Sequence, residues 1–553
     1  MSYEEFRICT DEVFEPRKIF DADGRALYEN ESISLLRTIV TRNDTDLLNQ
    51  YITAWEFPSR GIPVPELQSH DPFCIAVIHG SLDALRILLD ARSRNPNSTS
   101  VSIEKERRFS LLQVACQHAQ IEIVTFLLES EPSLATIYDR DAGGWTPLMA
   151  AAYSTGAVDS ADRHRGEALM NMLLDRGASA RDSVLSLTQS SSIDTASRGQ
   201  QAEATVLSLA ITGCSYVMVK RLLEAGADVH RPLAIYSDSP GFGVQDHGVD
   251  IRDVTALHLG SAARNVNGIR AALDHCNQHE EGSVLHLISC RDSMGRLPLH
   301  WAAAGSDPIF EPSLKDKLAQ RITDTFELLM PIHDAALTAE LLKTRDAQGA
   351  TPLHYAAQTH AGCGTQGSRH AYHTIQWLIS RGADASIVDS KGRTPLHALA
   401  HASLDGEPID LDVIKLLIDA GCPLDAIDEN DETALHILAR HLRQAHAAKM
   451  LIQHSAKVDI LNKSGNMPLH EAMKGCMRPK ESWDRKRQES VSLKMRLQAQ
   501  NEVVQALLGA HGTESVLDQA NNEGMTPRVL KGKTRRWWDA LEAFEQRRRA
   551  RVR

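Results

Sequence analysis

The sequence predicts an all-α solenoid in which helix-turn-helix repeats stack on one another and carry short β-hairpin or loop fingers. Three observations predict this fold. A phrase close to G-x-T-P-L-H-x-A-A recurs along the 553 residues, and a Leu/Ile pattern with helical spacing follows several copies. An Asp or Asn also stands at a fixed distance before the clearest copies. Repeats of this kind share one core between neighbours, so the length does not imply separate globular domains.

Composition and cysteine usage limit the class of protein. Hydrophobic residues make up 42% and charged residues 24%, which is typical of a folded chain. The sequence shows neither a secretory signal peptide nor an apolar run of about 18 residues, so we expect no membrane span. The nine cysteines are scattered and form no C-x-x-C pair, which indicates reduced thiols in the cytoplasm, the nucleus or both.

About twelve copies of the repeat, several of them degenerate, give the expected elements in order along the chain. Each copy reads as two short amphipathic helices. The predicted segments are a flank or cap at 1–33, degenerate repeats at 34–137, repeats with long insertions at 138–290, more regular repeats with insertions at 291–510, and a last repeat with a capping helix and basic tail at 511–553.

The recurring residue types have a structural logic. Asp or Asn starts a turn by accepting backbone N–H groups, and the following Gly supplies a positive φ. Thr caps the first helix, and Pro occupies its first position, where the missing N–H costs nothing. The motif resembles the ankyrin-repeat family, with consensus D-x-x-G-x-T-P-L-H-x-A-A. The resemblance implies a structural role, bonding the backbone between neighbouring repeats, for His300, His354, His397, His436 and His470.

Copies that are spaced more widely than the family period must release the surplus as loops or elongated helices. We expect insertions at Ser154–Arg165, Arg181–Gln201, Pro232–Asp250, Ser306–Lys317, Thr359–Ser368 and Gly475–Glu489. The serine-rich Arg181–Gln201 stretch reads either as a phosphorylated surface loop or as an unmodified linker.

The resemblance also implies where a partner protein binds, because ankyrin proteins usually meet their partners at the finger tips and inner helices of the concave face. The predicted tip residues are Trp145, Arg296, Arg393, Glu432 and Asn466, and the residues at the end of the first helix are Tyr153, Gln358, His401, Arg440 and Lys474. We expect the pair Arg393→Ala and Arg440→Ala to weaken partner capture while leaving melting almost unchanged.

No catalytic signature is visible, so we expect a protein without enzymatic activity and without a cofactor. Gly362–Gly367 matches G-x-G-x-x-G, but it follows a helix, which argues against a dinucleotide site. His360, Cys363, His370 and His373 are either loop residues or ligands of a zinc ion. A divergent catalyst or enzyme accessory with its site in such an insertion is the less favoured alternative.

The C-terminal segment combines an apolar stripe with basic residues. Trp537, Trp538, Leu541 and Phe544 recur at helical spacing and predict a helix that seals the last repeat. From Lys474 onward the net charge is +8, which leaves −20 of the chain's total of −12 for the preceding residues. The cluster Arg547, Arg548, Arg549, Arg551 and Arg553 fits either a solubilising tail or a nuclear transcription co-regulator, although no DNA-reading fold is visible.

Overall fold

The computed structural model describes 18–22, 26–28, 35–55, 71–94, 110–130, 134–156, 160–185, 202–237, 249–279, 283–305, 318–331, 333–359, 364–403, 408–477, 491–512 and 514–552. The chain divides into two compact units. One comprises residues 1–185 and 225–227, and the other comprises residues 186–224 and 228–553.

The first unit contains four described helix pairs. Its elements are β1 (Lys18–Phe20), β2 (Ala26–Tyr28), α1 (Leu35–Thr41), α2 (Thr45–Trp55), α3 (Pro72–Ile78), α4 (Leu82–Ser93), α5 (Leu111–Gln117), α6 (Ile121–Glu129), α7 (Pro147–Gly156), α8 (Ser160–Asp175) and β3 (Ser183–Leu185). β1 and β2 pair in antiparallel fashion. The first helices of successive pairs pack together, α1 on α3, α3 on α5 and α5 on α7.

The second unit contains seven described helix pairs. They are α9 (Val206–Ala210) with α10 (Tyr216–Glu224), α11 (Ala256–Ala262) with α12 (Val266–His279), α14 (Pro298–Ala304) with α15 (Leu318–Leu329), α17 (Pro352–Gln358) with α18 (Gly364–Ser380), α19 (Pro395–Ala402) with α20 (Leu411–Asp419), α21 (Ala434–Arg440) with α22 (Ala445–Gln453), and α23 (Pro468–Lys474) with α24 (Leu493–His511). Further elements are β4 (Ala202–Thr205), β5 (Leu233–Ser237), β6 (Val249–Val254), α13 (Ser283–Ser289), α16 (Ala335–Lys343), η6 (Leu442–Gln444), η8 (Glu514–Asp518) and α25 (Pro527–Val552).

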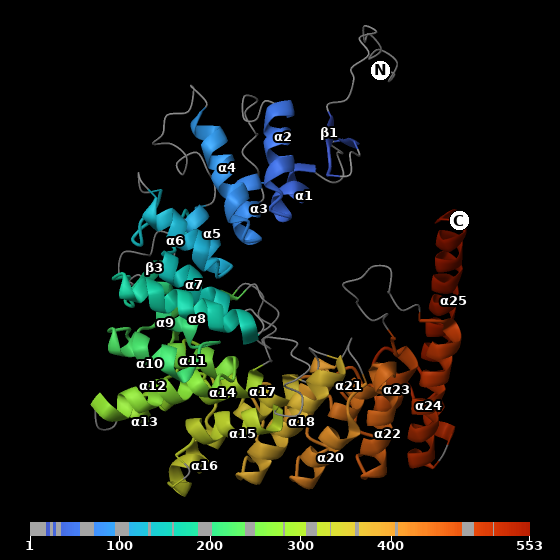
Figure 1. The fold of residues 1–553 in the computed structure, drawn as a ribbon. Coiled ribbons are helices and arrows are strands. Elements are labelled where there is room, and N and C mark those ends of the chain that lie inside the picture. The colour runs from blue at the N-terminus through green and yellow to red at the C-terminus, as the bar shows by residue number, and fades with distance from the viewer. Residues whose placement is uncertain are drawn as a thin grey trace, which may run out of the picture. The chain divides into compact units, whose positions relative to one another are not determined.

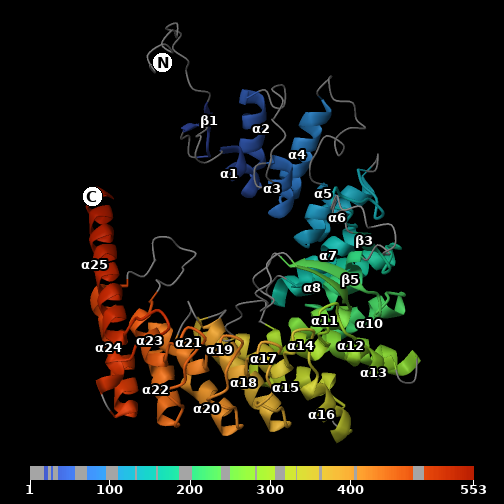
Figure 2. The same ribbon diagram turned by 180° about the vertical axis from the view of Figure 1, so that it is seen from behind.

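These pairs form two rows of helices. The first helices contact one another in the order α11, α14, α17, α19, α21 and α23, and the second helices in the order α12, α15, α18, α20, α22 and α24. Figure 1 shows that the second unit is curved, with the first helices on its inner side, and Figure 2 shows the same rows from behind. The all-α solenoid with hairpin fingers is therefore confirmed.

The sequence explains the close packing of the first helices. In α19, the Thr394 side chain accepts a hydrogen bond from the His397 backbone N–H, and Pro395 takes the first helical position. Leu396 and Leu399 are buried, and so are Ala398 and Ala400. Alanine at these positions lets neighbouring first helices approach, so the core is a continuous layer of Leu and Ala rather than a set of separate cores.

Successive fingers of the second unit are joined through their backbones. In each junction a backbone N–H of one finger donates to a carbonyl of the finger before it, over 2.7–3.2 Å. The pairs are Ser293 with Arg252, Ala347 with Met294, Ser390 with Gln348, Glu429 with Lys391, Lys463 with Asn430, and Asn522 with Ser464. This ladder fixes the spacing of the repeats independently of their side chains.

The insertions contain more regular structure than the sequence indicated. Pro232–Asp250 was expected to be an insertion in the form of a loop or an elongated helix, but β5 and β6 occupy its ends and pair in antiparallel fashion, with Ile235 opposite Ile251. Their alternating apolar residues explain this, because Leu233 and Ile251 pack with Val254 and Trp301. α13 and α16 are additional helices that we did not predict. Residues 157–159, 186–201, 238–248, 306–317, 360–363 and 478–489 of the predicted insertions lie outside the described residues.

The predicted C-terminal helix is present as α25, which contacts α23 and α24. Trp538 is 1% exposed and fits the sealing role, as does buried Leu530. Trp537 is 58% exposed, so the expectation that it also seals the last repeat is wrong. Adjacent residues of a helix point about 100° apart, so two neighbouring indoles cannot both face the same core. The Phe544 side chain lies outside the described residues.

Candidate protein-binding surface

Each finger is built on the Asp or Asn that the sequence singled out. In the finger before α19, one carboxylate oxygen of Asp389 accepts the backbone N–H groups of Lys391 and Arg393 at 2.9 and 2.8 Å. Gly392 has a φ of +74°, and an added Cβ there would lie 2.8 Å from the Ile427 carbonyl oxygen. The turn thus needs both an acceptor side chain and a glycine. Asp292, Asp346, Asp428, Asn462 and Asn521 accept bonds in the same way.

The repeated histidines connect neighbouring repeats. His397 Nδ1 accepts the Thr394 backbone N–H at 3.2 Å, and its Nε2 lies 3.1 Å from the Glu432 carbonyl oxygen of the next repeat. A carbonyl accepts only, so the proton is on Nε2. Burial lowers the pKa to about 4 in His258, His354 and His397. Both nitrogens of His397 are thus used in folding, which agrees with the structural role that the resemblance implied.

Two predicted residues meet in the first unit. Trp145 precedes α7 and is held by its backbone N–H, which donates to an Asp141 carboxylate oxygen at 2.8 Å. Tyr153 lies on α7, two turns along, and its ring stands edge-on to the Trp145 ring with centroids 5.6 Å apart. Tyr153 is 52% exposed and Trp145 is half-buried. The pair therefore forms a rigid, partly exposed aromatic surface.

Three predicted tip residues are buried. Arg296 donates through Nε to Asp292 Oδ2 at 2.7 Å, and its guanidinium carbon lies 5.1 Å from the centre of the Trp301 ring. Glu432 and Asn466 are likewise buried in a polar network. The expectation that these three side chains project from the tips is wrong. Each of the three stands directly before the Thr position, where its side chain points toward the helices. There it bonds polar groups of the same finger or of a neighbouring helix.

Six predicted residues come together along α19, α21 and α23 and the fingers before them: Arg393, His401, Glu432, Arg440, Asn466 and Lys474. We call this set the inner polar surface. Arg440 is at its centre, where its Nε donates to Glu471 Oε2 at 2.7 Å and its Nη2 bonds Glu432. Asn466 donates to Glu471 at 2.9 Å, and Lys474 Nζ lies 3.8 Å from the same carboxylate.

The electrostatics of this surface centre on Arg440 and Glu471. Burial opposes the charge of both groups, but their mutual attraction outweighs it. Burial alone would lower the pKa of Arg440, yet the carboxylates of Glu471 and Glu432 raise it above its ordinary value. Burial likewise tends to raise the pKa of Glu471, and Arg440 nevertheless brings it below its ordinary value. Both groups are therefore charged at neutral pH.

The outer part of the inner polar surface is less tightly held. Arg393 forms two contacts of 2.7 Å with Asp389 Oδ2 and remains half-buried. His401 Nε2 lies 4.0 Å from an Asp428 carboxylate oxygen, and burial, followed by Arg393, lowers the pKa of His401. His401 is thus neutral at pH 7. Gln358, the remaining predicted residue, is half-buried at the end of α17.

Glu471 is a member of this network that sequence reasoning missed. It occupies the position directly after the structural His. In two other repeats the residue at this position likewise bonds the Asp or Asn of its finger, because Trp301 Nε1 donates to Asp292 at 3.0 Å and the Tyr355 hydroxyl donates to Asp346 at 2.7 Å. A hydrogen-bonding group directly after the His was the signal that could have identified it.

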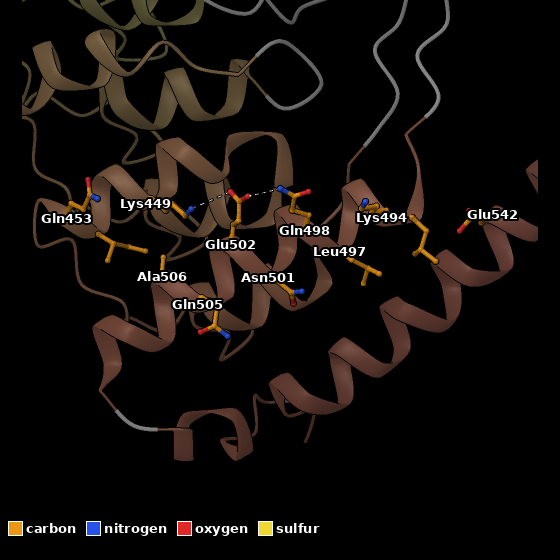
Figure 3. A pocket seen from close by; sticks show the side chains of 12 residues that line it. Lys449, Gln453, Lys494, Leu497, Gln498, Asn501, Glu502, Gln505, Ala506 and Glu542 are labelled. Carbon is orange, nitrogen blue, oxygen red and sulfur yellow. Dashed lines mark hydrogen bonds and ion pairs between the residues drawn. The ribbon is translucent and has the colours of Figure 1, made fainter.

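A groove lies among the last helices of the second unit. An open groove of about 1240 Å³ runs along α24, between α22 and α25 (Figure 3). Lys449 Nζ lies 3.3 Å from a Glu502 carboxylate oxygen, and this ion pair connects α22 with α24. The other lining residues are Ile452, Gln453, Leu493, Lys494, Leu497, Gln498, Asn501, Gln505, Ala506 and Glu542. The sequence analysis did not predict this groove.

The described residues contain neither a candidate metal site nor a candidate membrane-spanning helix. Among them, no group of three or more His, Cys, Asp or Glu side chains is arranged to hold a metal ion. His360 and Cys363 of the zinc hypothesis lie outside the described residues, so that hypothesis stays open. Of the helices that the structure describes, none is long and apolar enough to cross a bilayer.

Comparison with known proteins identifies the repeats. A model of three ankyrin repeats matches residues 73–183 and 399–478, and a single-repeat model matches residues 348–390. The palmitoyltransferase AKR1 of Lachancea kluyveri is 30% identical over 122 residues, which are 22% of this chain and 15% of that protein. Mouse inversin is 29% identical over 190 residues, 34% of this chain and 14% of inversin.

A solved structure of the ankyrin repeat domain of Bcl-3 covers 48% of this chain and 92% of that domain, with 19% identity and a TM-score of 0.30. The chain spans about one seventh of the length of the two curated relatives named above. The family models match the repeats whose fingers, caps and structural histidines are described above, and this chain therefore contains ankyrin repeats.

Proposed function

We propose that this chain is a protein-interaction scaffold or adaptor without enzymatic activity, and that it binds one or more partner proteins through the inner polar surface. The observation that carries the proposal is the arrangement of Arg440. Its guanidinium is held by two carboxylates, and a third of its side chain remains exposed. Ankyrin repeats generally mediate protein–protein interaction, which supports the same class of function.

A fixed, partly exposed arginine suits protein binding for an energetic reason. Ordering a long side chain at an interface costs about 0.5–1.5 kcal/mol. Glu432 and Glu471 already order Arg440 in the free protein. The side-chain entropy of Arg440 is therefore lost during folding and is not lost again when a partner binds. Arginine is also among the residue types that dominate binding hot spots.

The distribution of charge favours a protein partner over an extended polyanion. The inner polar surface mixes the cations Arg393, Arg440 and Lys474 with buried carboxylates, and His401 is neutral at pH 7. Nucleic-acid surfaces instead concentrate unpaired cations along a track. We therefore infer no sequence-specific nucleic-acid binding at this surface.

The relatives do not name the partner, because this chain matches only part of each. The activity of palmitoyltransferase AKR1 belongs to a protein of which this chain matches 15%. For this chain we propose binding alone, without cofactor, since the sequence carries no catalytic signature.

A nuclear transcription co-regulator is the second candidate. Exposed Lys531, Lys533, Arg535, Arg536 and Arg547 on α25 favour it, because clustered basic residues can serve nuclear import. Fluorescence imaging of the tagged protein tests this candidate: replacing Arg547, Arg548, Arg549, Arg551 and Arg553 by Ser is expected to reduce nuclear accumulation. A parent protein that is never nuclear would contradict the co-regulator role and leave the scaffold proposal in place.

The main proposal is tested with variants that leave Arg440 and its two carboxylates, Glu432 and Glu471, in place. His401→Ala combined with Lys474→Ala removes two partly exposed side chains of the inner polar surface. The matched control is Lys415→Ala with His446→Ala, which removes the same residue types from exposed positions on the second helices α20 and α22. Quantitative affinity purification is expected to show partners lost by at least about fivefold from the first variant, given the roughly 1 kcal/mol expected of interface contacts. Equal capture by both variants would contradict the proposal.

A further inference from the structure

The last described helix, α25, has a solvent-facing side that combines cations with apolar surface. Residues 529, 533, 536, 540 and 547 recur at intervals that place them on one side of an α-helix. Val529 is 45% exposed, and Lys533, Arg536 and Arg547 are exposed as well. Trp537, which borders this line, is 58% exposed. We call Val529, Lys533, Arg536, Trp537 and Arg547 the α25 face.

The opposite side of the same helix is the one that packs. Pro527, Leu530 and Trp538 are buried, and α25 contacts α23, α24 and η8 through this side. The exposure of the α25 face is therefore not a result of a loosely attached helix. The packed side fixes the orientation of α25 and directs the cations away from the repeats, while Trp537 lies at the border between the packed side and the α25 face and is exposed there.

The cations of the α25 face have no acidic partner among the described residues. Lys533 Nζ contacts the Met525 sulfur at 3.4 Å, and Arg536 Nε donates to the Gly532 carbonyl oxygen at 3.3 Å. Neighbouring Arg535, which lies off this face, instead pairs with Asp539 at 3.1 Å. Lys533 and Arg536 thus keep most of their charge available for an anion from outside the described chain.

Solubility alone does not explain the composition of this face. A solubilising helix needs charges, whereas an exposed indole beside an exposed Val reduces solubility. Trp and Arg are the residue types enriched at the centres of protein interfaces. The indole supplies apolar contact area and the cations supply charge complementarity, so the matching ligand carries both carboxylates and apolar side chains.

We propose that the α25 face binds an acidic polypeptide segment that has apolar side chains between its carboxylates. A protein ligand fits better than a nucleic acid because the residues before Lys474 carry a net charge of −20. A nucleic acid extending beyond α25 would be repelled by that charge, while a short acidic segment contacts only α25. This surface is separate from the inner polar surface, so the two proposals succeed or fail independently.

The test uses the full chain and a defined probe. Fluorescence anisotropy is measured with a short labelled peptide that repeats Glu and Leu at helical spacing, and with its counterpart in which every Glu is Gln. The variants are Lys533→Glu with Arg536→Glu, which reverses the charge, and Trp537→Ala, which removes the indole. The control Lys343→Glu with Lys415→Glu makes the same change of net charge at exposed positions on α16 and α20.

We expect the Glu peptide to bind the parent at least tenfold more tightly than the Gln peptide. Charge reversal should weaken binding of the Glu peptide at least tenfold, Trp537→Ala about fivefold, and the control less than twofold. Unchanged circular dichroism and melting of the variants ensure that the fold is retained. The proposal is overturned if the control weakens binding as much as charge reversal, if Trp537→Ala has no effect, or if a DNA duplex binds the parent more tightly than the peptide does.

Discussion

Replacing Arg440 by Ala is expected to destabilise the repeats around α21 and not only to affect binding. The substitution leaves the carboxylates of Glu432 and Glu471, whose side chains are 9% and 4% exposed, without their cation. Removing one partner of a buried ion pair costs about 3–5 kcal/mol. Arg440 is itself one-third exposed, and Glu471 keeps its contacts with Asn466 and Lys474, so we expect about 2–3 kcal/mol.

Urea unfolding, combined with hydrogen exchange of α19, α21 and α23, measures this loss. The informative background is Glu432→Gln with Glu471→Gln, in which no buried charge remains to be left unpaired. There, Arg440→Ala should cost less than about 1 kcal/mol. An equal cost in both backgrounds, or a cost below about 0.5 kcal/mol in the parent, would refute the role assigned to the ion pairs. The ion pairs of Arg440 therefore argue against the expectation that Arg393→Ala with Arg440→Ala leaves melting almost unchanged.

Three further predictions concern the fold. Because the folded-state pKa of His397 is about 4 against an ordinary 6.5, its contribution to stability is complete above pH 6.5 and is lost as the pH falls toward 4. At pH 5, each such histidine should lower the free energy of unfolding by about 2 kcal/mol relative to pH 7. Urea unfolding at both pH values measures this loss, and an unchanged midpoint would contradict it. Trp538→Ala should cost about 3–5 kcal/mol and expose α25 to hydrogen exchange, whereas Trp537→Ala should cost less than about 0.5 kcal/mol; equal costs would contradict the sealing role of Trp538 alone. Gly392→Ala should lower the melting temperature more than Gly421→Ala, since both have positive φ but an added Cβ at Gly421 meets nothing within 4 Å, and the reverse order would contradict the contact at Ile427.

The sequence was sufficient for features that depend on residues close together in one repeat. The finger Asp or Asn, the Thr cap and the His all act within about nine residues, and their types are restricted by backbone geometry. The resemblance supplied the link of His397 to the next repeat, which the structure places at 3.1 Å. Local patterns of this kind are readable because each residue has few alternatives.

The remaining features depend on contacts that spacing alone does not specify. Asn466 was expected at a tip, but its side chain is buried because Glu471 and Asn521 bond it from two other segments. α13 and α16 escaped prediction because they lie between copies of the motif and carry none of its residues. The groove along α24 depends on how three helices are placed, and no residue type in the sequence signals that arrangement.

One position in the repeat explains how the inner surface varies while the backbone stays the same. The residue after the structural His is Trp301, Tyr355, Ala398, Ile437 and Glu471 in successive repeats of the second unit. Where it is Trp301 or Tyr355, an aromatic group donates to the finger carboxylate of its own repeat. Where it is Glu471, the finger residue is Asn462 rather than Asp, and the carboxylate now comes from the helix and bonds Arg440 of the preceding repeat. With the amide Asn462 in the finger and the carboxylate of Glu471 on the helix, the carboxylate holds Arg440 on the inner side. Stacked repeats with the same backbone can in this way present different side chains to partners.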